Sequence, residues 1–389
     1  MAAPKLRFKE FGGDWSIKPL KNICKINQGL QIAIENRFTD DGENRYFYIT
    51  NEFLREGAKN TYFIENPPRN VICDENDILM TRTGNTGQVV TDVKGAFHNN
   101  FFKIDFDRSI INKNFFIEFL KKDTTQHLIL KYAGASTIPD LNHSDFYRIV
   151  MPITTIEEQA KIASFLSNVD EKISQLTQKH ALLSQYKQGM MQKLFSQQIR
   201  FKADDGSEFG EWEINIIRDV FTNKSKNFNP QNEGNLPCIE LEHLSQNTGK
   251  ILGTIESCEQ QSTKNLFEKN SVLFGKLRPY LRKFAKPKFK GVCSSEIWVL
   301  TGIKVSNDYL FQYIQSEQFS ELTNIQSGSK MPRADWGVIS EAEIEYPCLA
   351  EQTKIANFLS AIDQKIEVVA QQIEQAKIWK KGLLQQMFV

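Results

Sequence analysis

The stretch Glu-Gln-Ala-Lys-Ile-Ala-Ser-Phe-Leu-Ser at residues 158–167 returns as Glu-Gln-Thr-Lys-Ile-Ala-Asn-Phe-Leu-Ser at residues 351–360. The match continues without a gap, so that residues 158–195 align on residues 351–388 at a constant offset of 193 and are identical at 16 of 38 positions. Self-similarity of this length indicates an internal duplication, and it decides the architecture before any weaker signal is considered.

The same offset holds outside this segment. Arg7-Phe8-Lys9 returns as Arg200-Phe201-Lys202, and Pro139 returns as Pro332. Between these matches, residues 20–135 and 215–328 share little beyond general character. Each half is therefore expected to consist of a variable globular part followed by a repeated helix.

Both repeated segments are predicted to be long helices with a coiled-coil seam. Apolar residues recur in alternating steps of four and three, the 3.5-residue period that selects a supercoiled partner helix. Neither segment contains proline, and about 38 helical residues extend roughly 57 Å. The residues expected at the helix-pair interface are Ile162, Leu166, Val169, Ile173 and Leu176 in the first copy, and Ile355, Leu359, Ile362, Ile366 and Val369 in the second.

Two equivalent seams in one chain are most simply satisfied by each other. A pseudo-twofold axis relating duplicated halves would make the helices antiparallel and place the globular parts at opposite ends. The alternative is that each helix packs on its own domain, although such helices are usually shorter and show a broader stripe. We expect an α+β fold in which two mixed α/β domains are separated by two antiparallel helices, with boundaries at 1–153, 154–196, 197–346 and 347–389.

The globular parts are predicted to contain short strands and one helix each. In the first half we expect strands at 45–49, 71–73, 77–80 and 100–104 and a helix at 115–130. In the second half we expect strands at 237–241, 271–274 and 296–300 and a helix at 308–322. The similar order of elements with different sequences suggests one fold that carries two different surfaces.

The bulk composition is that of a globular protein without a membrane span. Hydrophobic residues make up 40% of the 389 residues and charged residues 24%, and no apolar run suits a signal peptide or a transmembrane helix, so a cytoplasmic protein is expected. The six cysteines lie far apart without a Cys-x-x-Cys pair, which argues against zinc and favours reduced, buried thiols. The net charge is only +1, so any contact with nucleic acid must come from local patches.

Two loops carry the chemistry of a DNA contact. Residues 81–88 place polar side chains between glycines after a predicted strand, and Arg, Asn and Gln can bond to base edges while Thr can reach phosphate. Residues 276–290 hold seven basic residues and no acidic one, with aromatic residues between them, as suits a phosphate backbone. A generic turn and a solvated charge run remain the alternatives. The candidate residues are Arg82, Thr83, Asn85, Thr86, Gln88, Lys276, Arg278, Tyr280, Arg282, Lys283 and Lys286.

A second pair of loops precedes each long helix, at residues 134–139 and 328–336. Small and polar residues followed by proline suit a structured turn near a ligand, although a plain connector explains them equally well. These loops add Ser136, Thr137, Ser329, Lys330 and Arg333 to the candidate DNA-binding residues.

The doubled helix motif resembles the two conserved regions of the specificity subunits of type I restriction–modification systems. Ile-Leu-Met-Thr-Arg-Thr-Gly at 78–84, Gly-Lys-Leu-Arg-Pro-Tyr-Leu at 275–281 and Gly-Ser-Lys-Met-Pro-Arg at 328–333 are similar to strings in the target-recognition domains of that family. The resemblance covers essentially the whole chain.

The resemblance implies a non-catalytic reader of double-stranded DNA. Each recognition domain would read one half of an asymmetric site, and the helices would set the gap and dock two methyltransferase subunits that modify adenine N6. Restriction and translocase subunits would join that core. S-adenosylmethionine, ATP and Mg²⁺ would be bound by the partner subunits, with no cofactor and no metal on this chain.

The sequence leaves two other classes of function to weigh, an enzyme and a protein-binding scaffold. Asn66-Pro67-Pro68-Arg69 resembles a methyltransferase motif, but arginine replaces the aromatic residue that stacks on a flipped base, and no matching glycine-rich loop is present. The histidines show no metal or triad spacing. A protein-binding scaffold without DNA is the remaining alternative, and the basic stretch at 276–290 argues against it.

Overall fold

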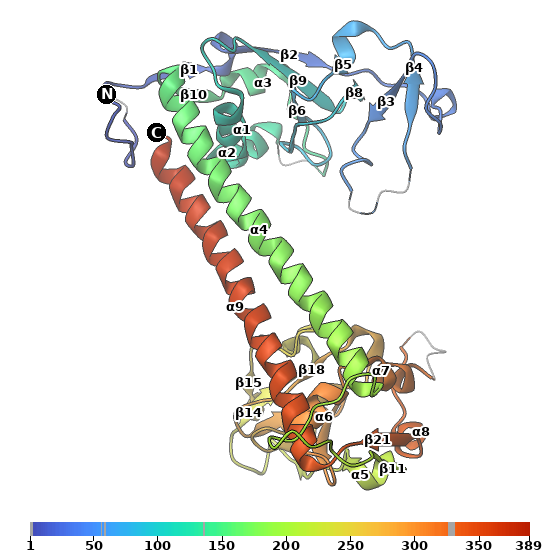
Figure 1. Cartoon of the computed structure of the whole chain (residues 1–389). Helices are drawn as coiled ribbons and strands as arrows, with labels where there is room; N and C mark the ends of the chain where they lie inside the picture. The colour runs from blue at the N-terminus through green and yellow to red at the C-terminus, as the bar shows by residue number, and fades with distance from the viewer. Residues whose placement is uncertain (1–2, 56, 58–59, 135–136, 326–330) are drawn as a thin grey trace. The chain divides into compact units, whose positions relative to one another are not determined.

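The computed structural model describes residues 3–55, 57, 60–134, 137–325 and 331–389 (Figure 1). The chain forms two compact units. Unit 1 comprises residues 1–177 and 371–389, and unit 2 comprises residues 178–370.

The two predicted long helices are present. Helix α4 covers Ile156–Phe195 and helix α9 covers Leu349–Met387. Acidic residues lie in the first turn of both helices and Lys193 lies in the last turn of α4, which matches the helix dipole. Unit 1 contains the beginning of α4 and the end of α9, whereas unit 2 contains the end of α4 and the beginning of α9. The helices run antiparallel within each unit, as expected.

The described residues of unit 1 form three small sheets and three short α-helices (Figure 1). Its first four-stranded sheet has the order β2 (Cys24–Gln28), β9 (Phe101–Phe106), β6 (Ile78–Thr81), β7 (Val89–Val90). The second has the order β4 (Phe63–Glu65), β3 (Arg45–Ile49), β8 (Gly95–Phe97), β5 (Ile72–Cys73). Strands β1 (Ser16–Pro19) and β10 (Val150–Ile153) form a two-stranded pair. The short helices are α1 (Lys113–Lys121), α2 (Asp123–Ala133) and α3 (His143–Arg148).

Unit 2 repeats this plan. Its first sheet has the order β12 (Phe221–Thr222), β20 (Ile297–Gly302), β17 (Val272–Gly275), β18 (Phe284–Ala285). Its second sheet has the order β13 (Asn227–Phe228), β16 (Lys264–Phe267), β19 (Gly291–Cys293), β14 (Pro237–Ile239), β15 (Ile255–Glu256). Strands β11 (Glu213–Ile216) and β21 (Glu343–Tyr346) form the pair. The short helices are α5 (Ile217–Val220), α6 (Asn307–Tyr313), α7 (Glu317–Asn324) and α8 (Trp336–Ser340).

The topologies of the two units agree strand by strand, as the similar order of the predicted elements suggested. The orders of the first sheets correspond, and each second sheet contains one parallel pair, β3 with β8 and β14 with β19. Unit 2 adds one edge strand, β13. The predicted mixed α/β character and the internal repeat are both confirmed.

The single helix predicted in each globular part is wrong, because each is a pair of helices. The backbone at Lys122 is extended, with ψ of 134°, and this separates α1 from α2. In unit 2 the side chain of Ser316 accepts a hydrogen bond from the amide of Phe319 and begins α7 after α6 has ended. Ser316 is an N-cap residue. The apolar residues on both sides of it fit one continuous helical pattern, so the pattern did not indicate a new helix at Ser316.

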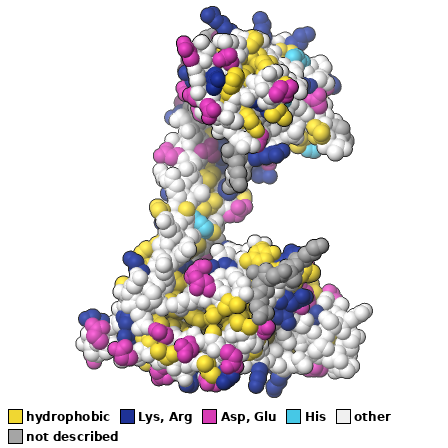
Figure 2. Space-filling model, turned by 90° about the vertical axis from the view of Figure 1, so that its right-hand side faces the viewer, with side chains coloured by type: hydrophobic (Ala, Val, Ile, Leu, Met, Phe, Trp, Pro, Cys, Tyr) yellow, Lys and Arg dark blue, Asp and Glu magenta, His cyan; other side chains and the backbone are white. Residues whose placement is uncertain are grey.

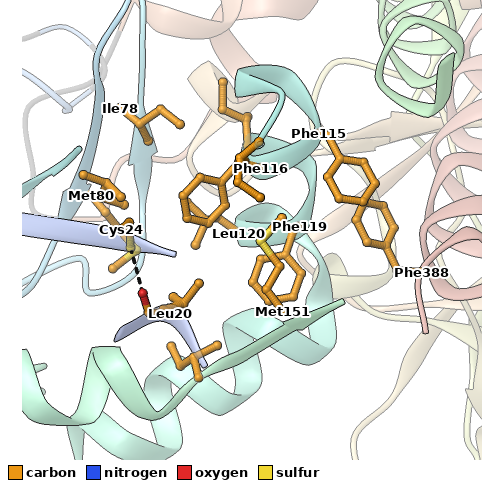
Figure 3. Close-up of a cluster of buried hydrophobic side chains, with 14 of the residues drawn as sticks. Leu20, Cys24, Ile78, Met80, Phe115, Phe116, Phe119, Leu120, Met151 and Phe388 are labelled. Carbon is orange, nitrogen blue, oxygen red and sulfur yellow. Dashed lines mark hydrogen bonds between the residues drawn. The ribbon is translucent and has the colours of Figure 1, made fainter. Parts of the chain in front are cut away.

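The core of unit 1 joins the short helices to the end of α9 (Figure 3). Phe388 stacks on Phe115, with ring centroids 4.7 Å apart. Phe195, at the position 193 residues earlier, packs on Tyr309 and Tyr313 in unit 2. The final aromatic residue of each repeated segment therefore anchors in a core built by the short helices of its unit.

The cysteine prediction is partly wrong. All six thiols are free, but Cys258 and Cys348 are exposed while the other four are buried. Among the described residues, no helix has the length and apolar character that a membrane crossing requires.

Candidate nucleic-acid interface

Loop A, residues 81–88, follows the buried strand β6 and is held as a tight turn. The amide of Gly87 donates to the carbonyl of Thr81 over 2.8 Å, and the amide of Thr81 donates to the carbonyl of Gln88 over 3.0 Å. Gly84 has a φ of +85°, and a Cβ there would lie 2.5 Å from the side-chain nitrogen of Asn51. The turn therefore needs glycine at this position.

Loop A divides into residues that hold it and residues that it presents. Arg82 donates to the carboxylate of Asp140 over 2.8 Å and lies over the ring of Phe102. Thr86 is buried, and its hydroxyl donates to the carbonyl of Pro139 over 2.7 Å. Asn85 and Gln88 are exposed, and their side chains have no partner among the described residues. Thr83 is half-buried and its backbone bridges to Asp140.

Loop B, residues 276–290, is less basic at its surface than its sequence suggests. Arg282 donates to the carbonyl of Gln315 and lies 3.8 Å from Glu317. Lys283 donates to the carbonyl of Leu241 over 2.6 Å. Further ion pairs join Lys286 to Asp308, Lys290 to Glu268 and, from the adjoining loop, Arg333 to Glu296.

The part of loop B that remains available is a short turn. Arg278 and Tyr280 are exposed and Lys276 is half-buried, with no side-chain partner among the described residues. A 3₁₀ turn, Pro279–Leu281, separates Arg278 and Arg282, which both adopt the left-handed conformation with φ of 52° and 48°. A non-glycine residue in this conformation costs conformational free energy and persists only where the surrounding structure holds it. Such residues cluster at functional sites. Lys288, further along, is exposed and also lacks a partner in the described part of the chain.

The two loops are fixed to the chain in the same way. The amide of Leu141 donates to the carbonyl of Arg82, and the amide of Ala334 donates to the carbonyl of Lys276, both over 2.8 Å. Backbone bridges join Thr83 to Asp140 and Leu277 to Arg333. In each unit, therefore, loop A or loop B and the loop that precedes the long helix belong to one surface. Thr137 is exposed on that surface in unit 1, whereas Ser136, Ser329 and Lys330 lie outside the described residues.

The surface charge agrees with these internal pairs. On the face drawn in Figure 2, Lys and Arg side chains are interspersed with Asp and Glu side chains.

The predicted seam residues are buried within their units. Ile162, Leu166 and Val169 belong to the core of unit 1, together with Leu383 and Met387 of α9. Their counterparts Ile355, Leu359 and Ile362 belong to the core of unit 2 with Met191 and Leu194 of α4. Ile173 and Ile366 are partly buried, and Leu176 and Val369 are buried. Within each unit the long helices pack on each other, as expected, and the same core also includes residues of the short helices.

Two lysine centres tie the helices together. In unit 1, Lys380 of α9 lies 2.6 Å from Asp170 of α4 and 3.0 Å from Glu118 of α1. In unit 2, Lys187 of α4 lies 2.6 Å from Asp363 of α9 and donates to Gln315 over 2.7 Å. Burial lowers the pKa of Lys187 despite Asp363. Burial would also lower the pKa of Lys380, but Asp170 and Glu118 outweigh it and raise that pKa.

A second repeated contact was missed, although the sequence contains its signal. Arg7 donates to both oxygens of the buried carboxylate of Glu158, over 2.7 and 2.8 Å. Arg200 makes the same bidentate contact with Glu351, over 3.1 and 2.7 Å. Burial would raise the pKa of Glu158, but hydrogen bonds from Arg7 and Thr154 hold it below its usual value. The recurrence of Arg-Phe-Lys and Glu-Gln at one offset could have identified this pairing.

Comparisons with known proteins agree with this duplicated architecture. The model of the type I restriction modification DNA specificity domain matches residues 12–185 and 210–377. The type I restriction enzyme MjaVIII specificity subunit of Methanocaldococcus jannaschii is 25% identical, with 97% of this chain and 94% of that protein covered. The EcoDI specificity subunit of Escherichia coli is 24% identical over 93% of this chain and 84% of that protein.

Solved structures show the same fold. The crystal structure of the type I restriction–modification S subunit from M. genitalium covers 100% of this chain and 99% of its own, at a TM-score of 0.58 and 17% identity. A structure from a study of complex assembly and conformational transition in the type I system covers 98% and 99%, with a TM-score of 0.58 and 13% identity. The chain belongs to the type I restriction modification DNA specificity family: it is a non-catalytic DNA-recognition subunit with two specificity domains.

Proposed function

We propose that unit 1 and unit 2 each read one half of an asymmetric, bipartite site on double-stranded DNA. The observation that carries this proposal is the pair of loops A and B, which are fixed by equivalent hydrogen bonds and present different side chains. One frame with two different surfaces suits two different half-sites. The helix pair would set the gap between them and dock two methyltransferase subunits, with restriction and translocase subunits joining that core.

The available side chains suggest which bases are read. Loop A presents the amides of Asn85 and Gln88, and amide side chains pair with the N6 and N7 edge of adenine. Loop B presents the guanidinium of Arg278, which pairs best with the O6 and N7 edge of guanine. Lys276 and Lys288 would contact phosphates, which position the protein without reading sequence.

The chemistry would belong to the partners. We propose that S-adenosylmethionine is bound by the methyltransferase subunits and that ATP and Mg²⁺ are bound by the restriction subunits, with none held by this chain. The complex would act in the cytoplasm, where the DNA is.

The test is an exchange of one reader at a time. Residues 20–135 are replaced by the equivalent part of a relative, and the methylated bases of a host carrying the complete system are sequenced. The expected result is that one half of the recognised sequence changes while the other half stays the same. A simultaneous change in both halves would contradict independent readers.

A further inference from the structure

Unit 1 contains a cavity of about 290 Å³ with an unusually basic lining. The beginning of α2 and the facing parts of α4 and α9 form its walls. Four lysines line it against two carboxylates, Asp123 and Asp170, with Ile173, Leu384 and Gln385 completing the lining; the lysines are Lys122, Lys377, Lys380 and Lys381.

Two of the lysines are neutralised by the carboxylates. Lys381 lies 2.6 Å from Asp123, and Lys380 lies 2.6 Å from Asp170. Glu118, which is outside the lining, also contacts Lys380 at 3.0 Å. Lys122 and Lys377 form no ion pair or side-chain hydrogen bond with any residue that the structure describes.

Lys122 is the unusual residue, because it is a lysine with only 7% of its surface exposed. Its ammonium nitrogen lies over the ring of Phe388, 5.7 Å from the ring centroid, and burial lowers its pKa. A buried ammonium that has an aromatic ring beside it but no anion or hydrogen-bond acceptor among the described residues still costs free energy. The observed fold therefore includes a cost that an added negative charge would relieve.

The position of Lys122 at the start of α2 increases this cost. Lys122 is the N-cap residue of the 11-residue helix α2, and its side chain caps no amide. The N-terminus of a helix carries partial positive charge and free amide groups, which favour an anion and disfavour a cation. The ammonium of Lys122 and the N-terminus of α2 therefore both favour an anionic ligand.

Unit 2 shows what this position looks like without such a ligand. Ser316 occupies the equivalent N-cap of α7, accepts from the amide of Phe319 and donates to the carbonyl of Tyr313. At the offset of 193, Ser184 replaces Lys377 and Gln188 replaces Lys381. Only the paired centre, Lys187 with Asp363, is kept. The additional lysines are therefore not required by the duplicated frame.

We propose that this cavity binds one oxyanion, a carboxylate or a phosphate group, on the ammonium of Lys122 and the first amides of α2, with Lys377 at the mouth. The apolar wall formed by Ile173 and Leu384 leaves room for a group that carries a short aliphatic part. The ligand is either a free ion or the acidic side chain of a partner subunit. The site does not depend on the DNA contacts of loops A and B.

The first arm of the test measures binding of inorganic phosphate to the full chain by calorimetry at constant ionic strength. Lys122→Met keeps the aliphatic stem and removes the charge. It should weaken phosphate binding about 10- to 100-fold, the effect of one charge-assisted hydrogen bond. Without phosphate, the variant should unfold at the same or a higher temperature than the wild type, because it removes an unpaired buried charge. Lys161→Met, at an exposed lysine of α4 near Glu10, should change neither measurement.

The second arm separates the two sources of the oxyanion. If the chain assembled with its methyltransferase subunits no longer binds phosphate, and Lys122→Met weakens assembly about tenfold or more, the occupant is a side chain of the partner. If phosphate binding persists in the complex and assembly is unchanged by the variant, the occupant is a free ion. Equal phosphate binding by wild type and variant, or no binding together with unchanged assembly, overturns the proposal.

Discussion

In unit 1 and unit 2 the same side chains connect the long helices to the globular part. The residues that surround these side chains differ between the units. The bidentate pairs Arg7 with Glu158 and Arg200 with Glu351 are equivalent at the offset of 193. Gln159 accepts from the amide of Asn112, and Gln352 accepts from the amide of Ser306, which are the N-caps of α1 and α6. The duplicated residues thus connect each long helix to the globular part of its unit.

The two units differ in the residues that surround the repeated lysines of the long helices. Lys380 in unit 1 faces two carboxylates, Asp170 and Glu118. Lys187 in unit 2 contacts one carboxylate, that of Asp363, and donates to the amide oxygen of Gln315, while Gln312 donates to Asp363. Duplication has therefore preserved the contacts that join α4 to α9, while the variable parts have altered the charge around them.

The largest effect is expected at the bidentate pairs. Glu158→Ala leaves Arg7 without its carboxylate, and Glu351→Ala does the same to Arg200 and also removes the acceptor of Trp212. Removing one partner of a fully buried pair costs about 3–5 kcal/mol, and this is the upper limit here because Arg7 and Arg200 are partly exposed. Both variants should show this loss in urea unfolding, with Glu351→Ala at the upper end. A loss below about 1 kcal/mol in both would mean that these pairs are not what joins the helices to the units.

Acid should reproduce part of this loss. The folded-state pKa of Glu158 lies below its unfolded value, so its contribution is fully present above the unfolded pKa and disappears as pH falls through the folded pKa. Urea unfolding between neutral and acid pH should therefore show a weaker pH dependence in Glu158→Ala than in the wild type. Parallel curves for the two proteins would contradict the pairing.

The lysine centres should respond unequally to removal of the amino group. Lys380→Met leaves Asp170 and Glu118 facing each other without a cation, whereas Lys187→Met leaves Asp363 with the amide of Gln312. We expect a cost of about 2–4 kcal/mol for the first variant and about 1–2 kcal/mol for the second. Hydrogen exchange resolved to peptides of each unit measures the two effects separately.

Alkaline pH should also distinguish these centres. The raised pKa of Lys380 means that its stabilisation is present below the unfolded pKa and is lost as pH rises through the folded one. The lowered pKa of Lys187 means that its cost at neutral pH is relieved as pH rises through its folded pKa. Exchange in the two units should therefore diverge above neutral pH, and the two Met variants should reduce the divergence. Identical pH profiles would show that the centres are equivalent.

The base-reading residues come next in magnitude. Arg278→Ala should cost about 1–3 kcal/mol at one base pair of the half-site read by unit 2, and Asn85→Ala should do the same for unit 1. Arg82→Ala should instead weaken recognition of the whole half-site of unit 1, because it releases loop A from Asp140. Competition binding against single-base variants of the site separates these outcomes. A uniform loss from Arg278→Ala would make it a phosphate contact.

The sequence predicted the repeated part well and the loops only in outline. The long helices follow from a period that extends over many turns, and the duplication doubles that signal. The break at Lys122 was missed because the apolar residues of α1 and α2 form one continuous pattern, and no glycine or proline marks the turn. Within the loops, sequence identifies the basic residues but not the carboxylates that neutralise them, since Asp308 and Glu317 are distant in sequence from Lys286 and Arg282.

The smallest effect is expected from phosphate contacts. It distinguishes two lysines of loop B, one exposed to solvent and one hydrogen-bonded within the unit. Lys288 is exposed without a partner in the described part of the chain, whereas Lys283 donates to the carbonyl of Leu241. Lys288→Ala should therefore weaken binding to every DNA sequence by about the same factor and reduce the slope of log affinity against log salt by about one. Lys283→Ala should leave that slope unchanged and lower the stability of unit 2 by about 1–2 kcal/mol. Filter-binding titrations across a range of salt, beside urea unfolding of the same variants, give both quantities. An equal reduction of the slope by the two variants would show that Lys283 leaves Leu241 to contact DNA, and the division between holding and presenting residues would then fail for unit 2.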